Sequence, residues 1–199
     1  TENQTDLTKY SHYPTRKQAI EVISQYYKNT PIFCTTGKSS RELYEMNEKY
    51  AKQHDFYCVG GMGHVSSIAQ QYKLNCNTRE VVCIDGDGAL LMHLGSMQTG
   101  ANVNGFTHIV LNNYCHESVG GLPTNIESVS VVNLAKAFGY NKVSSIKQLD
   151  EIQKVLNETD KEGSNFIEIR VSVDSTTTLP RPKKTPNEYI NEFMERDFS

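Results

Sequence analysis

The sequence predicts an α/β fold: a doubly wound parallel sheet with helices on both faces. Three observations support this class. Strand-like segments alternate with helical patterns, the strand segments are apolar without interruption, and four of them end in polar or Gly-rich turns. Right-handed crossovers between successive strands then place helices on both faces of the sheet. The chain has 199 residues, 37% of them hydrophobic, which is enough for one domain with its own core.

The elements follow one another with little interruption. Residues 1–13 are polar without an apolar period and predict an arm or linker before a single domain at 14–199. Segment 114–125 predicts a loop, and 174–184 an irregular basic tail. Apolar residues at helical spacing predict helices at 14–27, 39–53, 64–72, 89–102, 129–138, 147–158 and from Pro186. Buried strands are predicted at 31–35, 55–59, 80–84, 108–111, 142–145 and 165–173.

Charge and hydropathy exclude several classes of protein. A net charge of −3 and a pI near 6.1 argue against a dedicated nucleic-acid binder. No window approaches 18 uninterrupted apolar residues, so we expect no membrane span. The polar start lacks a signal peptide and an initiator Met, which suggests a trimmed chain or part of a longer polypeptide.

The cysteines suggest a reducing, cytoplasmic setting. Their number is odd and none forms a CxxC pair, so a disulfide framework is not expected. Cys34, Cys58 and Cys83 lie in apolar strand-like runs, where reduced buried thiols are expected.

The most informative motif is an acidic, Gly-rich turn after the third predicted strand. Asp87, between Gly86 and Gly88, begins a predicted helix, and an Asn pair that ends in Asn113 follows the fourth strand. Segment 89–111 is long enough for one helix and one strand, so both turns return to the same edge of the sheet. Ligands of such sheets bind at this edge, where the carboxyl ends of the strands meet.

These residue types predict a magnesium–diphosphate site. The backbone N–H groups of Gly88 and Ala89 point outward at the helix start and favour an anion such as phosphate. The Asp87 carboxylate and an Asn amide carbonyl are oxygen ligands suited to Mg²⁺. The alternative is a tight turn in which Asp caps a helix and Asn adopts a left-handed turn. No Walker A loop, G-x-G-x-x-G motif or EF-hand loop is present.

The acidic turn and the Asn pair together resemble the diphosphate-binding motif of thiamine diphosphate enzymes. The resemblance implies that Mg²⁺ is held by Asp87, Asn113 and the main-chain carbonyl of Cys115. Tyr114 and Cys115 are bulkier than the small residues expected after the Asn pair.

Two further turns extend this resemblance. The turn 60–63 resembles the family's Gly-x-hydrophobic-Gly segment, and this implies that the Gly60 carbonyl accepts from the cofactor's amino group. Met62 would then bend the cofactor into its V shape; the alternative is that Met62 only fills a gap in the core. Thr36 and Gly37, after the first strand, resemble a second diphosphate contact.

A narrower resemblance covers nearly the whole chain from about residue 14. It is to the C-terminal domains of phosphonopyruvate decarboxylases and to sulfopyruvate decarboxylase β subunits. The segments that carry it are 36–43, 56–64, 84–93, 116–124 and 181–186. This resemblance implies decarboxylation of a 2-oxo acid with a phosphonate or sulfonate group, and it does not choose between the two.

Candidate substrate-binding residues flank the predicted cofactor turns. Lys38 and Arg41 follow the first strand and could bind the anionic group, or they could be solvated charges at a helix start. His116, Glu117 and Ser118 follow the predicted metal-binding loop. His116 is a candidate proton donor to the carbanion, or a hydrogen-bonded loop residue. A cysteine hydrolase using Cys115 and His116 is disfavoured, because neighbours on a loop rarely form a thiolate–imidazole pair.

The resemblance also implies that half of the active site is elsewhere. Thiamine diphosphate enzymes use a Glu from a second, pyrimidine-binding domain to activate the cofactor, and the motifs present do not include it. We therefore expect a pyrimidine-binding domain or subunit as partner, in a homo- or hetero-oligomer. The alternatives are another thiamine diphosphate enzyme subunit and a non-catalytic binding module.

Overall fold

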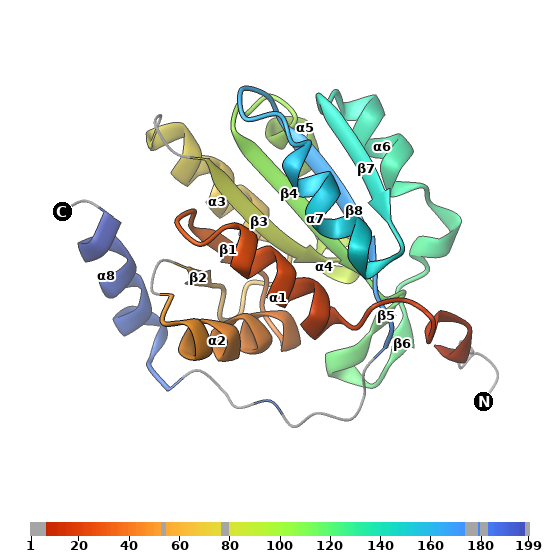
Figure 1. Cartoon of the computed structure of the whole chain (residues 1–199), viewed down its shortest axis with the longest axis horizontal. Coiled ribbons are helices and arrows are strands. Elements are labelled where there is room, and N and C mark those ends of the chain that lie inside the picture. The colour runs from red at the N-terminus through yellow and green to blue at the C-terminus, as the bar shows by residue number, and fades with distance from the viewer. Residues whose placement is uncertain (1–6, 53–54, 77–79, 174–178, 180–182, 198–199) are drawn as a thin grey trace.

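The computed structural model confirms the α/β class. It describes residues 7–197 except 53–54, 77–79, 174–178 and 180–182, so part of the tail segment 181–186 lies outside the described residues. A six-stranded parallel sheet has the order β2-β1-β3-β4-β8-β7 (Figure 1). Its strands are β1 (Ile32–Cys34), β2 (Phe56–Tyr57), β3 (Val81–Gly86), β4 (Phe106–Asn112), β7 (Lys142–Ile146) and β8 (Asn165–Arg170).

Helices cover both faces of this sheet. On one face, α1 packs against α2 and α7; on the other, α3 and α6 pack against α5. Figure 1 shows α1 and α7 crossing in front of the strands. The helices are α1 (Arg16–Tyr26), α2 (Lys38–Tyr50), α3 (Val65–Asn75), α4 (Asp87–Met92), α5 (Ser96–Gly100), α6 (Val131–Phe138), α7 (Leu149–Asn157) and α8 (Pro186–Asp197). None of the described helices is long and apolar enough to cross a membrane.

The two helical layers explain why the strands are apolar along their whole length. Successive side chains of a strand point to opposite faces. In β3, Val82 and Ile84 join the core beneath α1, α2 and α7, whereas Val81 and Cys83 join the core on the other face. All four are fully buried, and each large aliphatic side chain contributes about 1.5–3 kcal/mol by leaving water.

One predicted helix, 89–102, is instead two short helices. α4 ends where His93 adopts a non-helical conformation, and α5 begins at Ser96. The His93 ring packs edge-on against His64, with 4.1 Å between the ring centroids. The apolar periodicity thus extends this helix beyond the residue at which the structure interrupts it.

The segment predicted as a loop at 114–125 contains a small hairpin. Strand β5 (Cys115–His116) pairs antiparallel with β6 (Leu122–Pro123), and a 3-10 turn, Glu117–Val119, lies between them. The hairpin lies near the carboxyl end of the sheet (Figure 1). It therefore supplies side chains to the same edge as the turns after β1, β3 and β4.

The described end of the expected arm packs on the domain at Tyr10. The 3-10 turn Leu7–Tyr10 precedes α1, and Tyr10 is 5% exposed. Its ring stacks on Tyr114 with 4.3 Å between centroids, and its hydroxyl donates to the Glu127 carboxylate. The turn after β4, in which metal ligands are predicted, thus contacts the segment that precedes α1.

Candidate functional site

A cleft of about 100 Å³ lies at the carboxyl ends of β1, β3 and β4. After β1 the chain adds β2 on one side, then crosses to β3 on the other, so β1 and β3 flank the point where the strand order reverses. Doubly wound sheets bind their ligands at this point. Eleven of the residues predicted for the site line the cleft: Thr36, Lys38, Met62, Gly86, Asp87, Gly88, Ala89, Asn113, Cys115, His116 and Ser118.

Asp87 begins α4, and its carboxylate lies next to the Asn113 loop, close enough to interact with the backbone N–H of Asn113. The carboxylate is 3% exposed, and its Oδ2 accepts a 2.6 Å hydrogen bond from Thr124 Oγ1. Burial raises the pKa of Asp87 from its ordinary 3.8 to about 6, although the Thr124 hydroxyl and backbone N–H groups partly oppose this shift. Among the residues that the structure describes, no cationic side chain forms an ion pair with Asp87, and a buried carboxylate in this situation favours a bound cation.

Asn113 has a fixed amide orientation. Its Oδ1 accepts from the backbone N–H of Cys115 at 3.2 Å, and its Nδ2 donates to Glu117 Oε2 at 3.0 Å. The side chain is buried at 6% exposure. Its second carbonyl lone pair leaves Oδ1 able to ligate a metal.

The bulky residues after the Asn pair fit because the backbone turns at Tyr114. Tyr114 has φ +64°, a left-handed conformation, and its N–H donates to Asn112 Oδ1 at 3.1 Å. Such a conformation costs a non-Gly residue about 1–2 kcal/mol. The stacking on Tyr10 and the Asn112 hydrogen bond offset this cost, so a large side chain is tolerated here.

The glycines of the acidic turn leave room for a ligand beside Asp87. A Cβ at Gly86 would meet no atom within 4 Å, although Gly86 lines the cleft. At Gly88 a Cβ would lie 2.6 Å from His116 Cε1 and 3.4 Å from Met62 Cε. The backbone at Gly88 therefore lies close to two side chains predicted to face the cofactor, and the donor set fits a magnesium–diphosphate group.

The turn after β2 has the conformation that its glycines allow. Gly60, Gly61 and Gly63 all have positive φ, which other residues rarely adopt. Met62 lines the cleft, while the Gly60 carbonyl lies outside its lining and accepts from the Cys58 thiol at 3.3 Å.

The structure separates the two predicted substrate cations. Lys38 lines the cleft at the start of α2, and its Nζ is 2.6 Å from Glu117 Oε1. Arg41 lies one turn further along α2 and is not among the lining residues. Gly37 has φ +102°, and a Cβ there would lie 3.8 Å from Ser118 Oγ.

Sequence reasoning missed three residues at this site: Arg16, Glu42 and Thr124. Arg16 lines the cleft and forms two hydrogen bonds with the Glu42 carboxylate, at 2.7 and 2.9 Å. Arg16 and Glu42 lie 26 residues apart in the sequence, on two different helices. No local spacing in the sequence therefore predicts that they pair. Thr124 lies at the end of the segment predicted as a loop, where a hydroxyl carries no specific signal.

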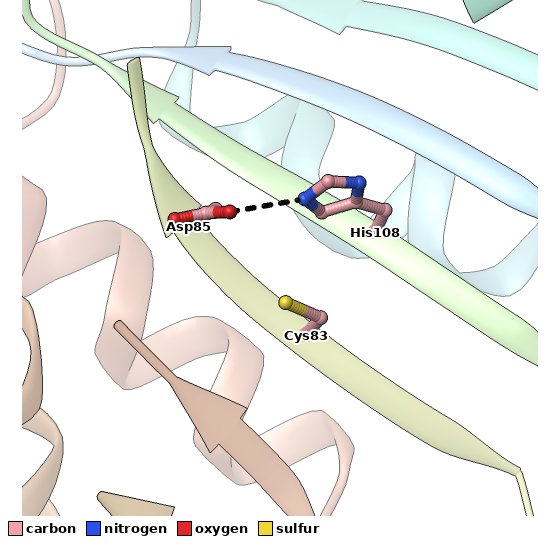
Figure 2. A group of neighbouring side chains, drawn as sticks. All are labelled: Cys83, Asp85 and His108. Carbon is pink, nitrogen blue, oxygen red and sulfur yellow. Dashed lines mark ion pairs between the residues drawn. The ribbon is translucent and has the colours of Figure 1, made fainter. Parts of the chain in front are cut away.

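A second polar group lies in the core just before the acidic turn. Figure 2 shows Cys83 and Asp85 on β3 and His108 on β4. Asp85 Oδ2 is 3.5 Å from His108 Nε2, and Asp85 Oδ1 accepts from the N–H of Gly86 at 3.1 Å. Burial raises the pKa of the Cys83 thiol, so the sulfur stays protonated and is a poor metal ligand. The five cysteines are free, as predicted.

A comparison with protein families identifies the domain. The profile of the family described as "Thiamine pyrophosphate enzyme, C-terminal TPP binding domain" matches residues 35–169. The chain belongs to this family. The match contains the acidic turn, the Asn pair and the turn after β2, so the resemblance drawn from those motifs is confirmed, and thiamine diphosphate is the cofactor of the family.

Curated relatives of this thiamine diphosphate-binding domain are decarboxylases. Phosphonopyruvate decarboxylase from Streptomyces viridochromogenes is 37% identical over 184 residues, 90% of this chain and 45% of that protein. Sulfopyruvate decarboxylase subunit beta from Methanocaldococcus jannaschii is 30% identical over 183 residues, 88% of this chain and 89% of that subunit. The chain therefore spans under half the length of the phosphonopyruvate decarboxylases it matches.

Solved structures confirm the fold. Benzoylformate decarboxylase from Polynucleobacter necessarius superposes with a TM-score of 0.64 and 16% identity, covering 83% of this chain and 34% of that one. At this identity the likeness extends to the fold alone.

The raised pKa of Asp87 predicts a pH-dependent metal affinity. Because burial raises this pKa, ionisation of Asp87 destabilises the folded protein as pH rises through about 6, and a bound cation removes that penalty. Metal affinity should then fall about tenfold from pH 7 to pH 5, as the carboxyl takes up its proton. Calorimetric titration with Mg²⁺ and thiamine diphosphate across this range measures the effect.

The Thr124→Val variant distinguishes the titration of Asp87 from the titration of the cofactor's own phosphates, which occurs in a similar pH range. The Thr124 hydroxyl lowers the pKa of Asp87, so its removal should move the midpoint of the pH profile upward. A midpoint that stays fixed would assign the titration to the cofactor instead.

Proposed function

We propose that this chain is the diphosphate-binding half of a thiamine diphosphate- and Mg²⁺-dependent decarboxylase that converts phosphonopyruvate to phosphonoacetaldehyde and CO₂. The observation that carries the proposal is the cleft itself. In a thiamine diphosphate-binding domain, Asp87, Asn113 and an open glycine turn converge at the point where the strand order reverses. Identity of 36–37% to two phosphonopyruvate decarboxylases supports the substrate.

The proposed cofactor residues divide into a metal group and a diphosphate group. Asp87, Asn113 and the Cys115 carbonyl would hold Mg²⁺. The N–H groups of Gly88 and Ala89 would contact the diphosphate at the start of α4, with Gly86, Thr36 and Gly37 around it. Met62 and the Gly60 carbonyl would contact the organic part. When bound, thiamine diphosphate would supply a nucleophilic carbon and an electron sink for the decarboxylation.

The proposed substrate residues lie on the hairpin side of the cleft. His116 would donate a proton to the carbon that loses CO₂, because its ring is beside Gly88 and close to Met62. Lys38 and Ser118 would bind the phosphonate, with Arg41 contributing from the next turn of α2. Glu117 holds Lys38 at the cleft wall, so its ammonium is already positioned before the substrate arrives.

A complete site would require a pyrimidine-binding domain or subunit that supplies the activating Glu. The relatives support this partnership, since some carry the name of a β subunit and others are twice as long as the matched region. We place the domain at 14–199 with the arm at 1–13, and we propose a cytoplasmic oligomer, homo- or heteromeric.

A substrate panel tests this proposal. The full-length protein, assembled with its pyrimidine-binding partner, Mg²⁺ and thiamine diphosphate, is assayed for CO₂ release from phosphonopyruvate, sulfopyruvate and pyruvate. We expect kcat/KM to be highest for phosphonopyruvate. A preference for sulfopyruvate would assign the second function, which the 30% identity to a similar-length β subunit favours. A preference for pyruvate would contradict both, and cofactor binding without turnover would indicate a binding module.

A further inference from the structure

Glu117 is a buried carboxylate that three donors share. Its side chain is 6% exposed. Oε2 accepts from Arg16 Nη1 at 2.5 Å and from Asn113 Nδ2 at 3.0 Å, while Oε1 accepts from Lys38 Nζ at 2.6 Å. These donors belong to α1, α2 and the loop after β4, so one carboxylate connects three segments at the wall of the cleft.

The contact with Asn113 determines which end of the amide faces Glu117. A primary amide has an acceptor oxygen and a donor nitrogen of nearly equal size, so sterics alone do not fix its orientation. An ionised carboxylate only accepts hydrogen bonds and therefore selects the nitrogen. The amide oxygen is thereby kept on the side of the Cys115 N–H and available to a metal.

Arg16 holds Glu117 in place. Its guanidinium is buried at 5% exposure and bonds Glu42 through Nε and Nη2, which leaves Nη1 for Glu117. The planar fork restricts the guanidinium to one orientation. The Thr15–Gln18 capping box fixes the first turn of α1, from which Arg16 extends. Arg16 lies before residues 35–169, the region that the family profile matches, so the family match does not itself include this residue.

The charges in this group balance. Arg16 and Lys38 are paired with Glu42 and Glu117, so the four side chains carry no net charge. Glu117 thus accepts hydrogen bonds from two cationic side chains. Both carboxylate oxygens of Glu117 already accept hydrogen bonds, so this side chain is better suited to positioning its neighbours than to transferring a proton.

We propose that Glu117, held by Arg16, is a positioning residue that keeps the Asn113 amide oxygen oriented for Mg²⁺. The inference rests on the proposed magnesium–thiamine diphosphate site and assigns how this chain prepares one of its ligands. Residues that orient metal ligands through hydrogen bonds typically change metal affinity about 10- to 100-fold when replaced.

The test compares Glu117→Met with Glu117→Gln in the full-length, assembled protein. Met has a similar shape but no acceptor, so we expect the Kd of Mg²⁺ at fixed thiamine diphosphate to rise about 10- to 100-fold. Gln keeps one acceptor oxygen for Asn113 and should recover part of the loss. Calorimetry gives the Kd, and Mn²⁺ electron paramagnetic resonance gives metal occupancy without any turnover.

The matched control is Glu45→Gln. Lys17 and Glu45 form an ion pair between the same two helices, α1 and α2, at 2.9 Å and 40% exposure for each side chain. This variant should leave the Kd of Mg²⁺ within about twofold of the wild-type value, because an exposed pair contributes little.

The outcomes separate this inference from the proposed function. A Glu117→Met protein that loses thermal stability but binds Mg²⁺ like the wild type would overturn the positioning role. Equal Kd values for the Met and Gln variants, both raised, would also overturn it, since charge and not the Asn113 contact would then matter. Absence of Mg²⁺-dependent cofactor binding in the wild type would instead contradict the proposed function.

Discussion

Asp87→Ala is expected to abolish Mg²⁺-dependent binding of thiamine diphosphate while leaving the fold intact. The substitution removes the one carboxylate among the proposed ligands, Asp87, Asn113 and the Cys115 carbonyl. Replacing residues that merely orient metal ligands costs about 10- to 100-fold, so loss of a charged ligand should cost at least about 100-fold, or about 2.7 kcal/mol. Calorimetric titration of the assembled protein with cofactor and Mg²⁺ measures this loss.

Although Asp87→Ala should weaken cofactor binding, it should not lower the thermal stability of the apoprotein. Ionised Asp87 is 3% exposed, and its raised pKa corresponds to about 3 kcal/mol of destabilisation at neutral pH. Loss of the Thr124 hydrogen bond offsets about 1 kcal/mol of the gain. The melting temperature of the apo variant should thus equal or exceed that of the wild type at pH 7. Unchanged cofactor affinity would remove Asp87 from the metal site.

Gly88→Ala should disable the site by a steric route. A Cβ at this position lies 2.6 Å from His116 Cε1, 2.7 Å from His116 Nδ1 and 3.4 Å from Met62 Cε, so the imidazole must move. A displacement of about 1 Å in a catalytic group can cost about 100-fold in turnover. We expect a loss of that order in kcat, with weaker cofactor binding because the displaced imidazole also lines the cleft. Steady-state kinetics and calorimetry report the two effects separately.

Gly95→Ala is the matched control for this substitution. Gly95 precedes α5 with φ −60°, and a Cβ there would meet no atom within 4 Å. Its effect on the free energy of unfolding should stay within about 1 kcal/mol, with cofactor binding unchanged. Adding His116→Ala to Gly88→Ala should restore cofactor affinity by making room. If the double variant binds no better, the clash with His116 is not the cause.

The sequence predicted the fold and the place of the cleft because both follow from local patterns. Unbroken apolar strands between helices specify a covered parallel sheet. Parallel strands bring their carboxyl ends to one edge, so the strand pattern alone predicts that Asp87 and Asn113 lie together. The glycines of the acidic turn likewise predict that a ligand can lie close to the backbone there.

The supporting residues could not be predicted, because they depend on long-range contacts. Arg16 meets Glu117 only after α1 has packed beside the hairpin, and the side chains come from positions 101 residues apart. Thr124 reaches Asp87 because β5 and β6 pair, which two-residue strands do not signal in advance. The contact between the His93 ring, at the end of α4, and His64 is likewise a tertiary contact that sequence periodicity does not show.

The stacking of Tyr10 on Tyr114 joins the beginning of the domain to the turn that presents the Cys115 carbonyl. A displacement of the chain before α1 is therefore transmitted to that turn through the stacked rings of Tyr10 and Tyr114. Tags or fusions attached immediately before Tyr10 should be judged by their effect on metal binding as well as on folding. In an assembly, the path by which the preceding chain approaches this domain would tune the geometry of the metal loop.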